Sequence, residues 1–199
     1  MTTKTIKTNA ILTSIMLAVG ISMIPSAFSI EYPFLNGDGT HDVCIISSDF
    51  NGVKLNGNTN QGSTIAPLVE NGMDEVGDNT NMSLTKITSC SSGKSVAYGS
   101  WLSSSYLGST QGPFGSTGNQ YKYVKFNTNS AVNFANSGSC QWYQNPNLEY
   151  VANHEFGHFA GLDLAHGSPS SPTMNEASCG SAYASIKTND INKINGWYN

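Results

Sequence analysis

Arginine is absent from this sequence, and charged residues of either sign are scarce. The nine basic residues are all lysine, against thirteen Asp and Glu, and charged side chains make up only 11% of the 199 residues. Arginine is the side chain best suited to bidentate contacts with phosphate and guanine, so its absence argues against nucleic acid as a partner. The hydrophobic content of 38% is nevertheless too high for a disordered chain, and we expect a folded protein.

Apolar runs long enough to span a membrane are also missing. The longest candidate, residues 10–24, has fifteen residues, whereas roughly 20 are needed to cross a bilayer. Two lysines precede this run and Ala-Phe-Ser follows it at 27–29, which is the pattern of an export signal with its cleavage site. We therefore predict that residues 1–29 are a signal peptide, that the mature chain is secreted and extracellular, and that no stable membrane span remains after cleavage.

Repeats, long charge runs and proline-rich linkers are absent as well, so residues 30–199 are expected to form one domain. Twenty Gly and seven Pro disfavour a helical bundle. Alternating or β-branched segments predict four short strands, with a Gly/Ser-rich loop between the last two: 42–47, 82–90, 95–101 and 121–127.

Three further segments have the apolar spacing of helices. The first is expected to be capped by the Ser-Thr pair at 63–64 and to end at Gly77. Asn147 is suited to cap the second, and Gly161 to close it in a left-handed turn. The third is expected to be capped by Thr or Asn at 188–189. Strands and helices in this order predict an α+β fold with the sheet in the amino-terminal part.

Three of the four histidines fall within thirteen residues, namely His154, His158 and His166, whereas His41 is isolated and is expected to be an ordinary surface residue. His154 and His158 are four residues apart on the second predicted helix, so both project from one face and can bind one metal ion. Glu155 stands beside the first of them, where it can take a proton from metal-bound water without itself being a ligand.

Gly161 comes three residues after His158, at the point where the helix must stop if a further ligand is to approach the metal from another side. His166 is the next imidazole. It would complete a three-histidine set and leave the fourth position of one tetrahedral Zn²⁺ ion open for water. Zinc lowers the pKa of such a water to about 7, and Glu155 would act as general base and then as proton shuttle to the leaving amine.

The run His-Glu-Phe-Gly-His-Phe-Ala-Gly-Leu at 154–162, followed by His166 and then by Ser-Pro-Thr-Met ending at Met174, resembles the metzincin clan of zinc endopeptidases, and within it the matrixins. Tyr-Val-Lys-Phe-Asn at 123–127 is similar to the edge strand along which matrixins bind extended substrate, and residues 189–194 are similar to their closing helix.

This resemblance implies a metzincin-like fold, with a twisted mixed sheet and two helices in the amino-terminal part. A short, irregular carboxy-terminal part would end in a helix. Residues 30–161 would form the upper part of the catalytic domain and residues 162–199 the lower part. By the same resemblance Met174, eight residues after His166, would lie beneath the zinc.

The chain also departs from the family pattern at the third ligand. In metzincins this ligand usually follows the glycine by three residues, but that position is Leu164, and the histidine comes two residues later at His166. Asp163 and Glu176 are alternative third ligands. No histidines remain for a second, structural zinc. Residues 36–40 offer oxygen ligands for Ca²⁺, but such a run is more often a plain turn.

Four cysteines, separated by 46, 50 and 39 residues, are too widely spaced for a thiolate zinc site and predict two disulfides in an exported chain. Three connectivities are open. We favour Cys140 with Cys179, since one precedes the ligand-bearing helix and the other follows Met174. Cys44 and Cys90, each beside a predicted strand, would then pair within the sheet region.

The sequence therefore predicts a secreted, monomeric zinc endopeptidase that hydrolyses protein or peptide substrates with a zinc-bound water activated by Glu155. The alternative is an exported, non-catalytic binding or structural protein that retains a metzincin-like scaffold. The presence of Glu155 favours the enzyme, because a chain without proteolytic activity has no need of the base.

Overall fold

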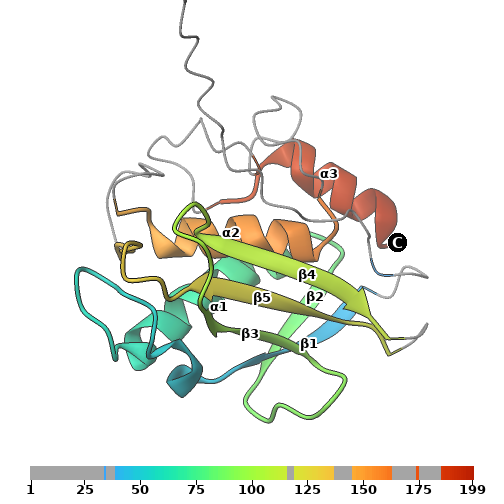
Figure 1. The fold of residues 1–199 in the computed structure, drawn as a ribbon. Helices are drawn as coiled ribbons and strands as arrows, with labels where there is room; N and C mark the ends of the chain where they lie inside the picture. Colours follow the sequence, from blue (N-terminus) through green and yellow to red (C-terminus); the bar gives the residue numbers. More distant parts are fainter. Residues whose placement is uncertain (1–33, 35–38, 116–118, 137–144, 163–173, 175–184) are drawn as a thin grey trace, which may run out of the picture.

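A five-stranded mixed sheet and three α-helices make up the fold, in a computed structural model that describes residues 34, 39–115, 119–136, 145–162, 174 and 185–199 (Figure 1). The predicted α+β class is therefore confirmed. The predicted signal peptide lies outside the described residues. In chain order the strands are β1 (Thr40–Ile45), β2 (Ser83–Ile87), β3 (Ser95–Ser100), β4 (Gly108–Phe114) and β5 (Tyr121–Asn127). The helices are α1 (Gly62–Asn79), α2 (Leu148–Phe159) and α3 (Thr188–Trp197), and a short 3₁₀ helix, η2 (Ser47–Phe50), follows β1.

The strands lie in the order β2-β1-β3-β5-β4, and all neighbours are parallel except β4, which is antiparallel to β5. Four of the strands were predicted from their apolar pattern. The fourth along the chain, β4, was wrongly expected to be loop, because its sequence Gly-Ser-Thr-Gln-Gly-Pro-Phe is poor in strand-forming residues. Its backbone pairs with β5 from Gly108 opposite Phe126 to Phe114 opposite Tyr121.

This extra strand also corrects the expected edge of the sheet. Residues 123–127 were compared with a substrate-binding edge strand, but β5 lies between β3 and β4, with a neighbour on each side. The edge next to β5 is β4. An edge strand is the one that can pair with an additional chain, so this correction moves any such pairing to residues 108–114.

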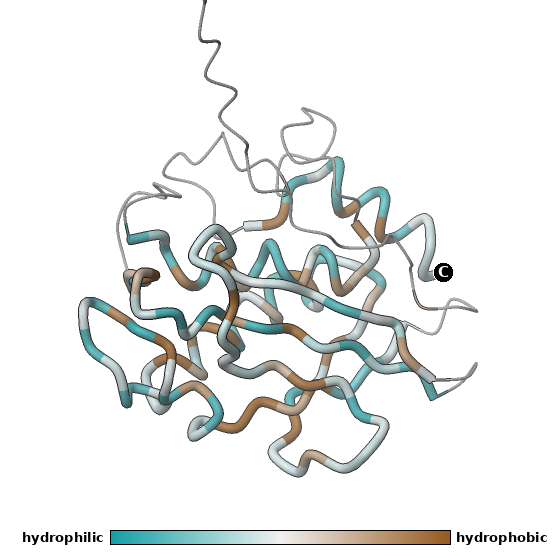
Figure 2. The backbone as a smooth tube through the Cα atoms, viewed as in Figure 1, coloured by the Kyte–Doolittle hydropathy of each residue, from teal (hydrophilic) through white to brown (hydrophobic). Residues whose placement is uncertain are grey.

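Helices α1 and α2 lie on the same side of the sheet and enclose the hydrophobic core with it (Figure 1). Hydrophobic stretches occur along both the helices and the strands (Figure 2). The core members that the sheet and the two helices contribute are buried almost completely, and they include Val43, Ile45, Ala97, Val124 and Phe126 from strands, Ile65, Val69, Met73 and Val76 from α1, and Val151, Phe156 and Phe159 from α2.

Helix α1 packs closely on α2 at Gly72. A Cβ atom added to Gly72 would lie 2.5 Å from Cβ of Ala152 and 2.6 Å from the backbone nitrogen of Asn153, so only glycine fits between the helices. This close contact accounts for a residue that is otherwise unfavourable in the middle of a helix.

Both ends of α1 differ from the prediction. It begins at Gly62 with Gln61 as N-cap residue, so the expected cap at 63–64 is wrong, and it runs past Gly77 to Asn79. The start is fixed by η2 and the residue after it. The backbone N–H of Gly62 donates to Oδ1 of Asn51 at 3.3 Å, and a Cβ atom at residue 62 would overlap the carbonyl oxygen of Ser47.

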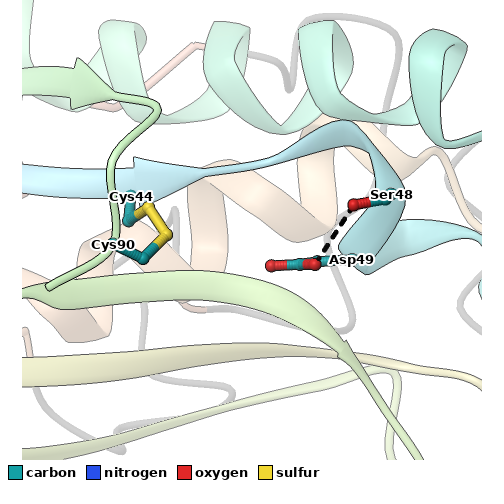
Figure 3. Close-up of a disulfide and its surroundings, with 4 residues drawn as sticks. All are labelled: Cys44, Ser48, Asp49 and Cys90. Atoms are coloured by element: carbon teal, nitrogen blue, oxygen red, sulfur yellow. Dashed lines mark hydrogen bonds between the residues drawn. A yellow bond between two sulfur atoms is a disulfide. The ribbon is translucent and has the colours of Figure 1, made fainter. Parts of the chain in front are cut away.

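A disulfide joins Cys44 of β1 to Cys90, which follows β2, with Cα atoms 5.4 Å apart (Figure 3). The predicted Cys44–Cys90 pair is thus present. Cys140 and Cys179 lie outside the described residues, so their predicted pairing stays a prediction.

The carboxy-terminal helix α3 is drawn above α2 in Figure 1. Its N-cap residue is Lys187, with no side-chain cap bond, so the predicted cap at 188–189 is wrong by one or two positions. Tyr198 follows the helix, and its hydroxyl donates to the carbonyl oxygen of Ala160 at 3.1 Å and accepts the N–H of Phe34 at 3.0 Å. None of the helices in the described part of the chain has the length and apolar character needed to cross a membrane.

Candidate functional site

Helix α2 carries most of the candidate site, and it forms as predicted. Oδ1 of Asn147 accepts hydrogen bonds from the backbone N–H groups of Glu149, at 2.9 Å, and of Tyr150, at 3.3 Å, which satisfies two of the free donors at the start of the helix. Every residue of α2 except Glu149 is buried. Such a helix is covered on all sides, so its polar side chains need a partner or a function to offset the cost of burial.

Two of those polar side chains are His154 and His158, which are 1% and 4% exposed. Their ring centroids are 4.8 Å apart and the ring planes are nearly perpendicular, at 88°. The i, i+4 spacing has therefore placed two imidazoles side by side on one face of the helix, as the sequence predicts.

The tautomer of His158 follows from its surroundings. Its Nδ1 lies 3.1 Å from the carbonyl oxygen of Leu162. A carbonyl can only accept, so Nδ1 carries a proton, and in the neutral imidazole Nε2 is then the nitrogen with the lone pair. A backbone carbonyl on one imidazole nitrogen is a common way to orient the other nitrogen toward a metal.

The turn at Gly161 makes that contact. Gly161 has φ +100°, in the left-handed region expected for a helix-closing glycine. Its N–H donates to the carbonyl of His158 at 3.0 Å, and the N–H of Leu162 donates to the carbonyl of Gly157 at 2.9 Å. The chain thereby folds back on α2, and the carbonyl of Leu162 reaches the ring of His158.

Glu155 is 2% exposed and lies beneath the edge strand β4. The hydroxyl of Thr110 is 2.8 Å from Oε2 of Glu155 and 2.9 Å from the backbone carbonyl oxygen of the same residue. A Cβ atom at Gly108 would lie 2.6 Å from Oε1. The carboxylate is therefore enclosed by two alternate residues of β4, and glycine at 108 leaves the space that it occupies.

Met174 is fully buried and packs against α2 at Gly157. A Cβ atom at Gly157 would lie 2.9 Å from the sulfur of Met174, so this glycine makes room for the methionine. The residue that the family resemblance places under the zinc is thus in contact with the helix that bears the two histidines.

The carboxy-terminal end of α2 is held by a buried lysine on β5. Nζ of Lys122 donates to the carbonyl oxygen of Phe159 at 2.6 Å and lies 4.4 Å from the ring centroid of Phe34. Burial lowers the pKa of Lys122 to about 7. Burial also raises the pKa of Tyr198 to about 12, an effect that the N–H of Phe34 partly opposes.

His41 packs against the same phenylalanine. Its ring is stacked on that of Phe34 with centroids 3.6 Å apart, and the residue is only 9% exposed. The prediction that His41 is an ordinary surface residue is therefore wrong.

The predicted third ligand, His166, and its alternatives Asp163 and Glu176 all lie outside the described residues. Within the described ranges, no group of three His, Cys, Asp or Glu side chains is arranged to hold a metal ion. The structure therefore places two of the three predicted ligands side by side, and the predicted base on the same helix, where it contacts β4. The candidate calcium run 36–40 is described only at its last two residues.

Two residues at this site were missed by the sequence analysis, namely Thr110 and Gly108. Both belong to β4, which was expected to be loop. The only local signal for them is their spacing, since residues 108 and 110 of a strand face the same side.

Comparison with models of protein families and a search of curated proteins each found no match to this chain.

Proposed function

We propose that this chain is a secreted zinc endopeptidase of metzincin type, which hydrolyses peptide bonds in proteins or peptides. The observation that carries the proposal is the buried pair His154 and His158 on α2, with the enclosed carboxylate of Glu155 beside it. Burying three polar side chains within five residues of one helix lowers the stability of the fold, so their presence favours a functional role.

The donor set suits zinc. Two imidazoles one helical turn apart match the ligand type and spacing of catalytic zinc sites, and the carbonyl of Leu162 selects Nε2 of His158 as the binding atom. We assign the third ligand to His166. Zinc bound by these residues would polarise the scissile carbonyl and make a water acidic enough to attack at neutral pH.

Glu155 is proposed as the proton carrier of the reaction. It would accept a proton from the attacking water and deliver it to the nitrogen of the leaving amine, which restores the carboxylate for the next cycle. Its seclusion under β4 keeps bulk water away from the carboxylate, which strengthens its interactions with the reacting groups.

The substrate is proposed to lie along β4. Family resemblance implies an extended substrate beside an edge strand, and the edge on this side of the sheet is β4 rather than β5. The backbone of residues 108–114 is then the template for substrate pairing, while inward-facing Thr110 contacts the base.

The decisive experiment incubates the purified mature chain with unfolded protein, with and without a chelator, and determines its zinc content. We expect chelator-sensitive cleavage and one zinc per chain. Zinc without cleavage would support the exported binding protein instead.

A matched pair of variants tests the mechanism. Glu155→Gln keeps the shape of the side chain and is expected to bind zinc but lose activity by about 100-fold or more, the scale of general-base catalysis. Glu149→Gln changes the same residue type on the partly exposed first turn of α2 and should leave activity near wild type. Undiminished cleavage by Glu155→Gln would refute the role of the base.

A further inference from the structure

The hydroxyl of Thr110 on β4 contacts both the carboxylate and the backbone carbonyl oxygen of Glu155. Resting on the proposed function, we propose that Thr110 is a positioning residue, which fixes the carboxylate of Glu155 at the place where it exchanges protons with water and leaving amine.

Two residues of β4, Thr110 and Gly108, lie against the carboxylate. Thr110 is 5% exposed, and its hydroxyl lies 2.8 Å from Oε2 and 2.9 Å from the carbonyl oxygen of Glu155. The hydroxyl is therefore located against the helix backbone as well as against the side-chain end. On the other side, Oε1 fills the space where Gly108 has no side chain. The hydroxyl of Thr110 thus restrains a glutamate side chain with three torsions, and the missing side chain at Gly108 leaves room for the orientation that it holds.

Such confinement matters for proton transfer. A general base works only within hydrogen-bonding reach of the proton it abstracts, about 2.6–3.2 Å between heavy atoms, and a displacement of about 1 Å can cost 100-fold in rate. Glu155 needs to move only by a change of rotamer to leave that range. The hydroxyl of Thr110 opposes this movement.

The position of Thr110 also links the base to the substrate. Thr110 belongs to the edge strand on which the substrate is proposed to pair, and its side chain faces inward to α2. The same strand would then set the register of the peptide and the location of the carboxylate. Thr110 acts through Glu155 in this arrangement and does not contact the reacting atoms.

Two pairs of variants differ essentially in the hydroxyl alone. Thr110 and Thr110→Val have the same shape, and Thr110→Ser and Thr110→Ala differ in one oxygen atom. We expect Thr110→Val and Thr110→Ala to lower kcat about tenfold or more, with KM changed less than about threefold and zinc content unchanged. Thr110→Ser should retain kcat within about threefold of wild type. Thr85→Val, at an exposed position on β2, is the control and should behave as wild type.

The serine and alanine variants keep the test decisive if Thr110→Val does not fold. Equal kcat values for Thr110→Ser and Thr110→Ala would overturn the proposal. So would a Thr110→Val variant in which only KM is changed. An inactive wild-type chain would refute the proposed function, which is a different result from an active wild type with an equally active Thr110→Val.

A measurement without turnover tests the contact itself. Unfolding free energies of Thr110→Val, Glu155→Met and the double variant, each with its zinc content determined, form a double-mutant cycle. We expect the two effects to be non-additive, because each substitution removes one partner of the same hydrogen bond. Additive effects would show that the hydroxyl does not hold the carboxylate.

Discussion

Replacing the buried lysine at the carboxy-terminal end of α2 tests whether burial lowers the pKa of its ammonium group. Lys122 extends from β5 to the carboxy-terminal end of α2, where Nζ donates to the carbonyl of Phe159 at 2.6 Å. Its pKa is lowered from 10.5 to about 7 by burial. Between these two values the unfolded chain binds one more proton than the folded chain, so this group makes the free energy of unfolding rise as pH rises.

The expected slope follows directly. One proton of difference corresponds to about 1.4 kcal/mol per pH unit, so between pH 8 and pH 10 the wild type should gain roughly 2–3 kcal/mol from Lys122. Lys122→Met has a similar shape and cannot gain this stability. The pKa of Tyr198 is raised from 10.0 to about 12 on folding, so this hydroxyl contributes with the opposite sign near pH 10, but both proteins contain it and it cancels in their difference.

Urea denaturation at pH 8, 9 and 10 measures the effect as the difference between wild type and Lys122→Met. Groups common to both proteins cancel in this difference. Lys125→Met reports the loss of a lysine from the same strand, since Lys125 lies on the other face, where Nζ contacts Oε1 of Gln111. A difference between wild type and Lys122→Met that stays constant from pH 8 to pH 10 would show that the carbonyl of Phe159 and the ring of Phe34 keep the ammonium charged despite its burial.

Three other predictions concern the metal, the helix contact and the second disulfide. His166→Ala, purified as folded protein, should contain much less zinc than wild type by elemental analysis, and full zinc retention would move the third ligand to another residue. Gly72→Ala should lower the free energy of unfolding by about 1–3 kcal/mol in urea denaturation, because the added methyl group overlaps Ala152 and the backbone after it, and unchanged stability would contradict the tight contact between α1 and α2. Peptide mapping without reduction should find a fragment joining Cys140 to Cys179, and a fragment joining either of them to Cys44 or Cys90 would show this pairing to be wrong.

Features with local sequence signals could be predicted. The helix that carries His154 and His158 has its cap at Asn147 and its closing turn at Gly161, and all of these lie within fifteen residues of one another. The cap, the spacing of the two histidines and the turn are each determined by neighbours in the chain, so α2 and the side-by-side imidazoles agree with the prediction.

Features that depend on distant partners could not be predicted. Strand β4 consists largely of Gly, Ser and Pro, and it is a strand because β5 pairs with it, so neither β4 nor the place of Thr110 was foreseen. His41 looks like a solitary polar residue in the sequence and becomes a packed ring only where Phe34 stacks on it. The burial of Lys122 likewise arises from the approach of α2 to the sheet.

The two histidines are close neighbours in the chain, whereas the sheet beneath them is assembled from remote segments. Thr40 pairs with Ser83 and Val43 with Ser95, both in parallel strands. Parallel pairing between segments so far apart closes long loops before any contact compensates for the lost entropy, and such sheets form slowly. An imidazole pair exists wherever this stretch is helical, but Glu155 is enclosed only after β4 has joined β5. Under the proposed function, the place of the base therefore depends on a pairing between two strands, whereas the spacing of the two histidines depends on one helix alone.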